Sequence, residues 1–131
     1  MVTETLFTIH SYVRYLVLLA GVGAVIAAII GWGTAGLPPR AERALSGAFI
    51  GLLDLQIVLG VLLLLTGFPF YGALTGHLFM MVLAAAAAHG ASVLARRREP
   101  ARSGSPARTI GFMISLLLIV GGIMAIQRTI I

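Results

Sequence analysis

The sequence predicts an all-α fold, an antiparallel four-helix transmembrane bundle that occupies residues 1–131 as a single membrane domain. Hydrophobic residues make up 60% of the chain and charged residues 10%, whereas a soluble domain is about 45–50% apolar and about 25% charged. A chain of this size leaves much of its surface exposed, so lipid must solvate most of it. Four apolar segments each have the roughly 20 residues needed to cross a bilayer. These predicted spans are Thr8–Trp32, Arg43–Leu65, Gly76–Ala95 and Arg108–Gln127.

The connections between the spans carry the signals that end helices. Pro38 and Pro39 lie in the first connection, residues 33–42, and proline lacks the amide hydrogen that a continuing helix needs. The second connection, residues 66–75, is uncharged and aromatic, which suits a turn at the membrane interface. The third, residues 96–107, reads RRREPARSGSPA and is polar, basic and flexible. Short connections of this kind make consecutive helices antiparallel.

The charged residues predict how the chain is inserted. All nine basic residues are arginines, and none lies before the first span or in the second connection. Seven lie in or beside the first and third connections: Arg40, Arg43, Arg96, Arg97, Arg98, Arg102 and Arg108. The positive-inside rule therefore puts loops 33–42 and 96–107 in the cytoplasm and both termini outside. Since the arginines lie in these loops, their charge indicates topology and not a nucleic-acid partner.

Two histidines stand at the start of odd-numbered spans, which run in the same direction. His10 and His77 should therefore lie at the same depth, near the outer face, on different helices. Two imidazoles at one level are the protein ligands of a six-coordinate haem b iron. Arg14, one turn deeper, is a candidate partner for a haem propionate or for Asp54. The alternative is that both histidines are polar residues at the level of the lipid headgroups.

A second polar group is predicted deeper in the bundle. His89 lies about 18 Å below His77 and points about 120° away, so it cannot bind the same iron. Asp54 and Ser115 fall at a similar depth, and a contact between Asp54 and His89 is expected. That contact is either a proton relay or second cofactor site, or a structural clamp between helices. Gln56 is about 200° from Asp54 around the helix, so the two cannot face one pocket.

Small residues recur at spacings that suit close helix packing. Gly47 and Gly51 form a small-xxx-small pair, and residues 84–88 are an unbroken run of alanine. Such residues let helices approach closely in lipid, and they also make room for a flat cofactor.

Several kinds of chemistry have no residues to support them. The chain has no cysteine, which excludes disulfides, thiolate metal sites and iron–sulfur clusters. No zinc-protease, phosphate-loop or dinucleotide-binding motif is present. No catalytic residue is therefore assigned, and the chain is not expected to be an enzyme by itself.

Three stretches resemble one family of small four-helix bacterial membrane proteins, the cytochrome b-like family. HSYVRYLVLL, residues 10–19, resembles its opening LHSxxRWxVLL, and LLDLQIVLG, residues 52–60, resembles its xxDLQxxLG. GHLFMM, residues 76–81, followed by Ala88 and His89, resembles its EHPxxM and AH pattern.

The resemblance covers most of the chain and implies a bundle that binds haem b. Two positions depart from the pattern, since Gly76 replaces a glutamate and Leu78 a proline. Loss of the acid removes the basis for proton transfer at position 76 but leaves the imidazole of His77 in place.

Three functions remain open from the sequence. The first is a haem b-binding subunit for electron transfer near the outer face, within a larger respiratory or photosynthetic complex. The second is a structural or accessory subunit without a cofactor, packed against other membrane subunits. The third is a small transporter or quinone-site protein that uses Asp54, His89 and Gln56.

Overall fold

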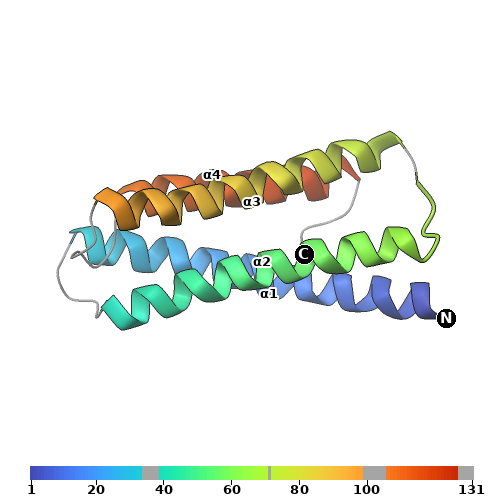
Figure 1. Ribbon diagram of the computed structural model, residues 1–131, viewed down its shortest axis with the longest axis horizontal. Helices are drawn as coiled ribbons and strands as arrows, with labels where there is room; N and C mark the ends of the chain where they lie inside the picture. Colours follow the sequence, from blue (N-terminus) through green and yellow to red (C-terminus); the bar gives the residue numbers. More distant parts are fainter. Residues whose placement is uncertain (34–38, 71, 99–105, 127–131) are drawn as a thin grey trace.

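The computed structural model describes residues 1–33, 39–70, 72–98 and 106–126. They form four α-helices, α1 (Val2–Gly33), α2 (Pro39–Leu65), α3 (Gly72–Arg98) and α4 (Pro106–Ala125). Figure 1 shows an elongated bundle in which consecutive helices run in opposite directions. All four helices are long and apolar enough to cross a membrane. The predicted four-helix fold is confirmed, and the chain is a multi-pass membrane protein.

Each helix begins at an earlier residue than the predicted span. α1 begins six residues before Thr8, α2 and α3 each begin four residues early, and α4 begins two residues early. The spans were set by the apolar stretch alone, whereas the helices continue into more polar sequence. In the first turns of α1, Thr5 and Thr8 donate hydrogen bonds to carbonyls four residues back. α4 ends at Ala125, and the predicted end at Gln127 lies outside the described residues.

We call the end of the bundle where α1 and α3 begin the histidine end, and the opposite end, where α2 and α4 begin, the arginine end. At the histidine end, α2 finishes in a turn in which Gly67 has φ +93°. The amide of Gly67 bonds the Leu64 carbonyl at 3.2 Å, and that of Phe68 bonds the Leu63 carbonyl at 3.4 Å. This is a Schellman turn, which favours glycine at the left-handed position. It places Phe68 in a stack with Phe7 of α1, with ring centroids 5.5 Å apart.

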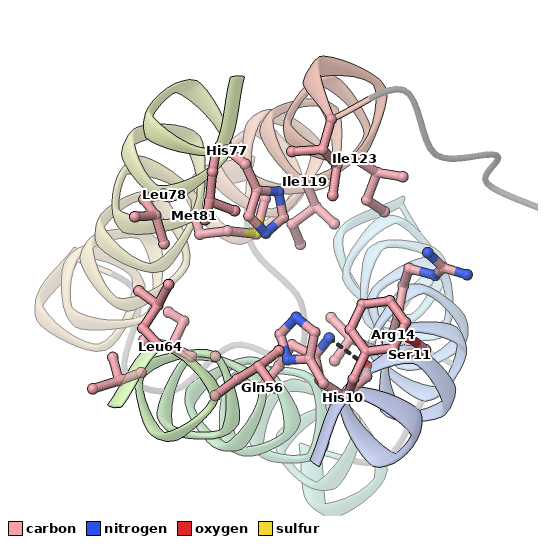
Figure 2. Close-up of a pocket in the computed structure, with 18 of the residues that line it drawn as sticks. His10, Ser11, Arg14, Gln56, Leu64, His77, Leu78, Met81, Ile119 and Ile123 are labelled. Carbon is pink, nitrogen blue, oxygen red and sulfur yellow. Dashed lines mark hydrogen bonds between the residues drawn. The ribbon is translucent and has the colours of Figure 1, made fainter. Parts of the chain in front are cut away.

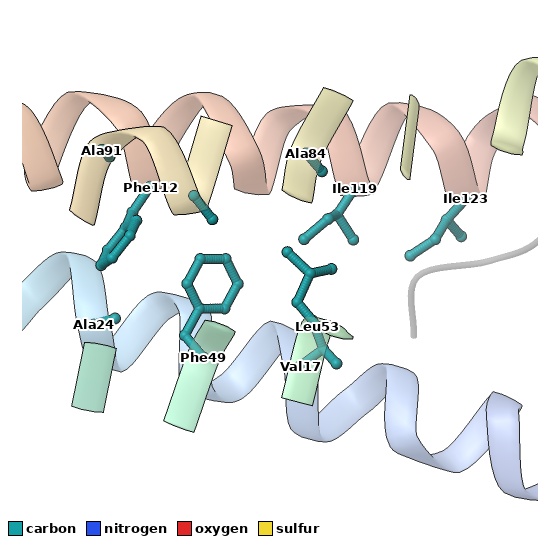
Figure 3. Packing of buried hydrophobic residues seen from close by; sticks show 10 residues of the cluster. Val17, Ala24, Phe49, Leu53, Ala84, Ala91, Phe112, Ile119 and Ile123 are labelled. Carbon is teal, nitrogen blue, oxygen red and sulfur yellow. The ribbon is translucent and has the colours of Figure 1, made fainter. Parts of the chain in front are cut away.

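The hydrophobic core runs along the middle of the bundle (Figure 3). Its two largest rings, Phe49 and Phe112, meet edge to face with centroids 5.3 Å apart. Ala84 and Ala88 are completely buried, which supports the packing interpretation of the alanine run. The cluster comprises Val17, Ala24, Phe49, Leu53, Ala84, Ala88, Ala91, Phe112, Ile119 and Ile123.

The small-xxx-small pair on α2 does not pack within the chain. A Cβ atom built on Gly47 or Gly51 would meet no atom within 4 Å. Close approach occurs instead between α3 and α4, where Gly111 lies against Ala91. The pair on α2 therefore neither brings two helices of this bundle together nor lines a cavity.

The arginine end is held by a buried ion pair that the sequence did not predict. Nη1 of Arg108 on α4 lies 3.1 and 3.0 Å from the two carboxylate oxygens of Glu42 on α2. Ser46, one turn along α2, contacts the same carboxylate at 3.5 Å. Residues 39–42, expected in a loop, are thus the first turn of α2, and Glu42 is 2% exposed.

Candidate functional site

A cavity of about 170 Å³ lies between the four helices at the histidine end, where one ordered water needs only about 10–15 Å³ of such space. Its floor is formed by core residues, including Val17, Leu53 and Ile119. Phe7 and Phe68 belong to its outer wall. Most of the lining is aliphatic or aromatic, and five polar side chains reach it: His10, Ser11, Arg14, Gln56 and His77.

The two predicted histidines lie on facing walls of this one cavity. His10 comes from α1 and His77 from α3, and Figure 2 shows their rings on opposite sides of the open space. Nδ1 of His77 is 2.9 Å from the Gly122 carbonyl oxygen on α4. A carbonyl oxygen only accepts, so Nδ1 carries the proton and Nε2 keeps a free lone pair. The hydrogen bond therefore fixes both the tautomer and the orientation of His77.

His10 is positioned through its backbone. Nε2 of Gln56 on α2 donates a hydrogen bond of 2.7 Å to the His10 carbonyl oxygen (Figure 2). The His10 ring lies close to α2 at Gly60, where a Cβ atom would come within 3.3 Å of its Cε1. Gln56 and Gly60 together seat this imidazole, and neither was assigned this role from the sequence.

A second glycine makes room for the other imidazole. A Cβ atom on Gly122 would overlap the Met81 methyl group and lie 3.5 Å from Nδ1 of His77. The carbonyl of the same glycine accepts the His77 hydrogen bond. On each of the two walls, a histidine therefore packs against a glycine of a neighbouring helix. Residue spacing along the sequence cannot reveal such a contact between helices.

Arg14 lines the cavity but does not pair with Asp54. Its Nη2 donates to the Tyr15 hydroxyl at 2.9 Å, and its guanidinium lies 4.7 Å from the centre of the Tyr15 ring. Asp54 is bonded to His89 instead, so the expected alternative of an Arg14–Asp54 pair is wrong. Arg14 therefore lines the cavity while its guanidinium lies against Tyr15, an exposed residue outside the cavity lining.

Three buried polar atoms in the cavity residues have no hydrogen-bond partner among the described residues: His10 Nδ1, Arg14 Nε and Gln56 Oε1. Buried polar groups in native proteins are satisfied in more than about 90% of cases. These three atoms around one cavity are available to bond a ligand or ordered water.

The polar residues predicted deeper in the bundle, Asp54, His89 and Ser115, do not form one cluster. Nε2 of His89 lies 2.9 and 3.0 Å from the two carboxylate oxygens of Asp54, and both side chains are half exposed on the outside of the bundle. Ser115 is fully buried and donates to the Ala84 carbonyl at 2.8 Å, so it does not share this contact. Gln56 faces the cavity. The residues expected for a transporter or quinone site therefore do not form one site.

The donor set of the cavity suits a cofactor better than a bare metal ion. Within the described residues, no group of three or more histidine, cysteine, aspartate or glutamate side chains is close enough to hold a metal. Two facing imidazoles fit an iron that already has its equatorial ligands from a porphyrin. The apolar lining residues suit the hydrophobic faces of such a molecule.

The chain matches no protein-family model, no curated protein and no solved structure. The resemblance to the cytochrome b-like family therefore stays a prediction.

Proposed function

We propose that this protein is a haem b-binding membrane subunit that transfers electrons. The observation that carries the proposal is the placement of His10 and His77 on facing walls of one cavity. His10 and His77 would hold the haem iron, and haem would supply a one-electron redox couple. The proposal also places the chain in the cytochrome b-like family, as its three matching stretches suggest.

Contacts within the chain position both histidine side chains. The Gly122 carbonyl accepts a hydrogen bond from Nδ1 of His77, which leaves Nε2 as the nitrogen that would hold the iron. Gln56 fixes the α1 backbone at His10. Because Gly60 and Gly122 have no side chains, both rings can lie close against the neighbouring helices.

Arg14 is the proposed partner of a haem propionate. A guanidinium forms strong paired hydrogen bonds with a carboxylate, and its buried Nε has no partner among the described residues. Ser11, one turn above it along α1, adds a hydroxyl at the same wall. The surrounding aliphatic side chains exclude water from the remaining surface of the ligand.

The arginine pattern supports a specific location and context. We propose that the histidine end lies near the outer face of a bacterial inner membrane, with the arginine end in the cytoplasm. We also propose that its electron donor and acceptor are other membrane subunits of a respiratory or photosynthetic complex, or a quinone.

The test is a reduced-minus-oxidised absorbance spectrum of the purified protein, made in cells with ample haem. We expect a b-type α-band that is lost in His10→Ala and in His77→Ala. The matched control is His89→Ala, which removes the same ring outside the cavity and should keep the band. Absence of the band in the unmodified protein would refute haem binding, and its retention in both cavity variants would refute the ligand assignment.

A cofactor-free accessory subunit is the second candidate. The observation in its favour is the exposed face of α2, where Gly47 and Gly51 touch nothing in this chain. This candidate predicts no b-type band, so the same spectrum separates the two functions.

A further inference from the structure

The contact between Asp54 and His89 faces the bilayer instead of the interior of the bundle. Their side chains are 48% and 52% exposed. Asp54 lies eleven residues before the end of α2 and His89 nine residues before the end of α3, about 16 and 14 Å along the helices. Both are therefore close to the middle of a hydrocarbon core about 30 Å thick. Ionisable groups at this depth almost always face protein or a water-filled cavity, so this pair needs a polar cover.

The surface around the pair is shaped for another helix. Gly47 and Gly51 lie two turns and one turn from Asp54 along α2. Both are exposed, and a Cβ atom on either of them would meet no atom within 4 Å. Exposed glycines within a span let a second backbone approach closely. The glycines and the polar pair thus point to a helix as the cover.

We propose that the cover is a second copy of this chain, packed on the face formed by α2 and α3. Two copies inserted in the same direction are related by a two-fold axis along the membrane normal. Around that axis, α2 of each copy meets α3 of the other, and Asp54 lies level with the partner's His89.

The charges of the pair are self-complementary in this arrangement. His89 uses Nε2 for Asp54 of its own chain, and no described residue bonds its Nδ1. When the imidazole is protonated, Nδ1 donates to the partner's Asp54. A carboxylate can accept hydrogen bonds from two imidazoles. The two Asp54 carboxylates and the two protonated His89 imidazoles then form a hydrogen-bonded ring with no net charge. In this ring, all four side chains are shielded from lipid.

This inference does not depend on haem binding. The cavity and the α2–α3 face share none of the residues used above, so a dimer without haem, or haem in a monomer, is a distinct outcome. A stable dimer would double the number of cofactors in one assembly if both proposals hold.

The absence of cysteine from the chain makes disulfide trapping a clean experiment. Gly51→Cys and Val93→Cys lie on the same side of the polar pair, one turn towards the arginine end on α2 and α3. Membranes containing both single variants, expressed together, are oxidised gently and separated without reductant. We expect a cross-linked dimer that contains one copy of each variant. The matched control is the mixture of Leu19→Cys and Leu117→Cys, which are 71% and 70% exposed on α1 and α4.

Asp54→Asn then tests the polar ring. It keeps the shape of the side chain but removes the charge, and we expect the yield of cross-linked dimer to fall about three- to tenfold. Helical content by circular dichroism confirms that this variant is folded. A cross-linking yield no higher than that of the control mixture would overturn the proposal, and so would another protein trapped on Gly51→Cys in place of a second copy.

Discussion

The two ends of the bundle differ in how their buried polar side chains are paired. At the arginine end, the carboxylate of Glu42 is paired with Nη1 of Arg108, with side chains only 3% and 10% exposed. At the histidine end, atoms of His10, Arg14 and Gln56 are equally buried but have no partner among the described residues. The same four helices therefore build a closed contact at one end and an open site at the other.

This difference separates a structural role from a binding role. A buried charge with an oppositely charged partner is compensated within the protein, and removing one partner leaves the other charge uncompensated. Buried polar atoms without partners raise the free energy of the empty protein. A ligand that satisfies them recovers this free energy, so the comparison predicts that substitution lowers stability at the arginine end and ligand affinity at the histidine end.

The largest effect is expected from breaking the closed contact. Arg108→Leu leaves the carboxylate of Glu42 buried without its cation, and we expect a loss of about 3–5 kcal/mol in the free energy of unfolding. Unfolding of the protein in detergent micelles, followed by circular dichroism, measures this loss. Arg43→Leu is the matched control, because Arg43 lies next to Glu42 on α2 but is exposed. This variant should change the free energy of unfolding little.

The double variant Glu42→Gln with Arg108→Leu shows where the loss comes from. It removes both charges, so much of the stability lost in Arg108→Leu should return. If Arg108→Leu alone is as stable as the unmodified protein, the arginine end is not held by this ion pair.

The open site should respond to a single added methyl group. In Gly122→Ala the new Cβ displaces the Met81 methyl group towards the cavity and crowds Nδ1 of His77. Overpacking of this kind costs about 1–3 kcal/mol, so haem affinity should fall about tenfold or more while both ligands remain. Haem titration of the purified apoprotein, followed by the b-type band, measures the affinity.

Gly121→Ala is the matched control for this variant. A Cβ at position 121 meets only the Met80 methyl group, at an ordinary contact distance of 3.9 Å. Equal haem affinity in Gly121→Ala and Gly122→Ala would show that the ligand does not use the His77 wall.

The sequence predicts the order and number of the helices but little of their rotation. Residues facing lipid and residues facing the core are equally apolar in a bundle of this type, so no polar stripe marks the inner face of each helix. The directions of the helices predict that His10 and His77 lie at the same depth. Whether their side chains face one cavity depends on how each helix is rotated about its axis, and only the structure supplies that rotation.

The same reasoning explains what the sequence missed. Glu42 was placed in a loop because Pro38 and Pro39 precede it, although Pro39 in fact begins α2. Proline is common in the first turn of a helix, where its missing amide hydrogen is not needed. The acids among the arginines of that end, Glu42 and Glu99, were the available signal for a pair with Arg108.

The smallest effect is expected where the histidine end is closed by packing alone. Phe68→Leu keeps an apolar side chain on the Schellman turn but removes the stack with Phe7. An aromatic pair contributes about 0.5–1.5 kcal/mol beyond its buried area, and the same unfolding measurement should show a loss of that size. Phe70→Leu is the control, since Phe70 is 63% exposed and should not respond. A loss in Phe68→Leu as large as that in Arg108→Leu would mean that the two ends are held equally firmly, and the contrast between them would then be confined to their polar atoms.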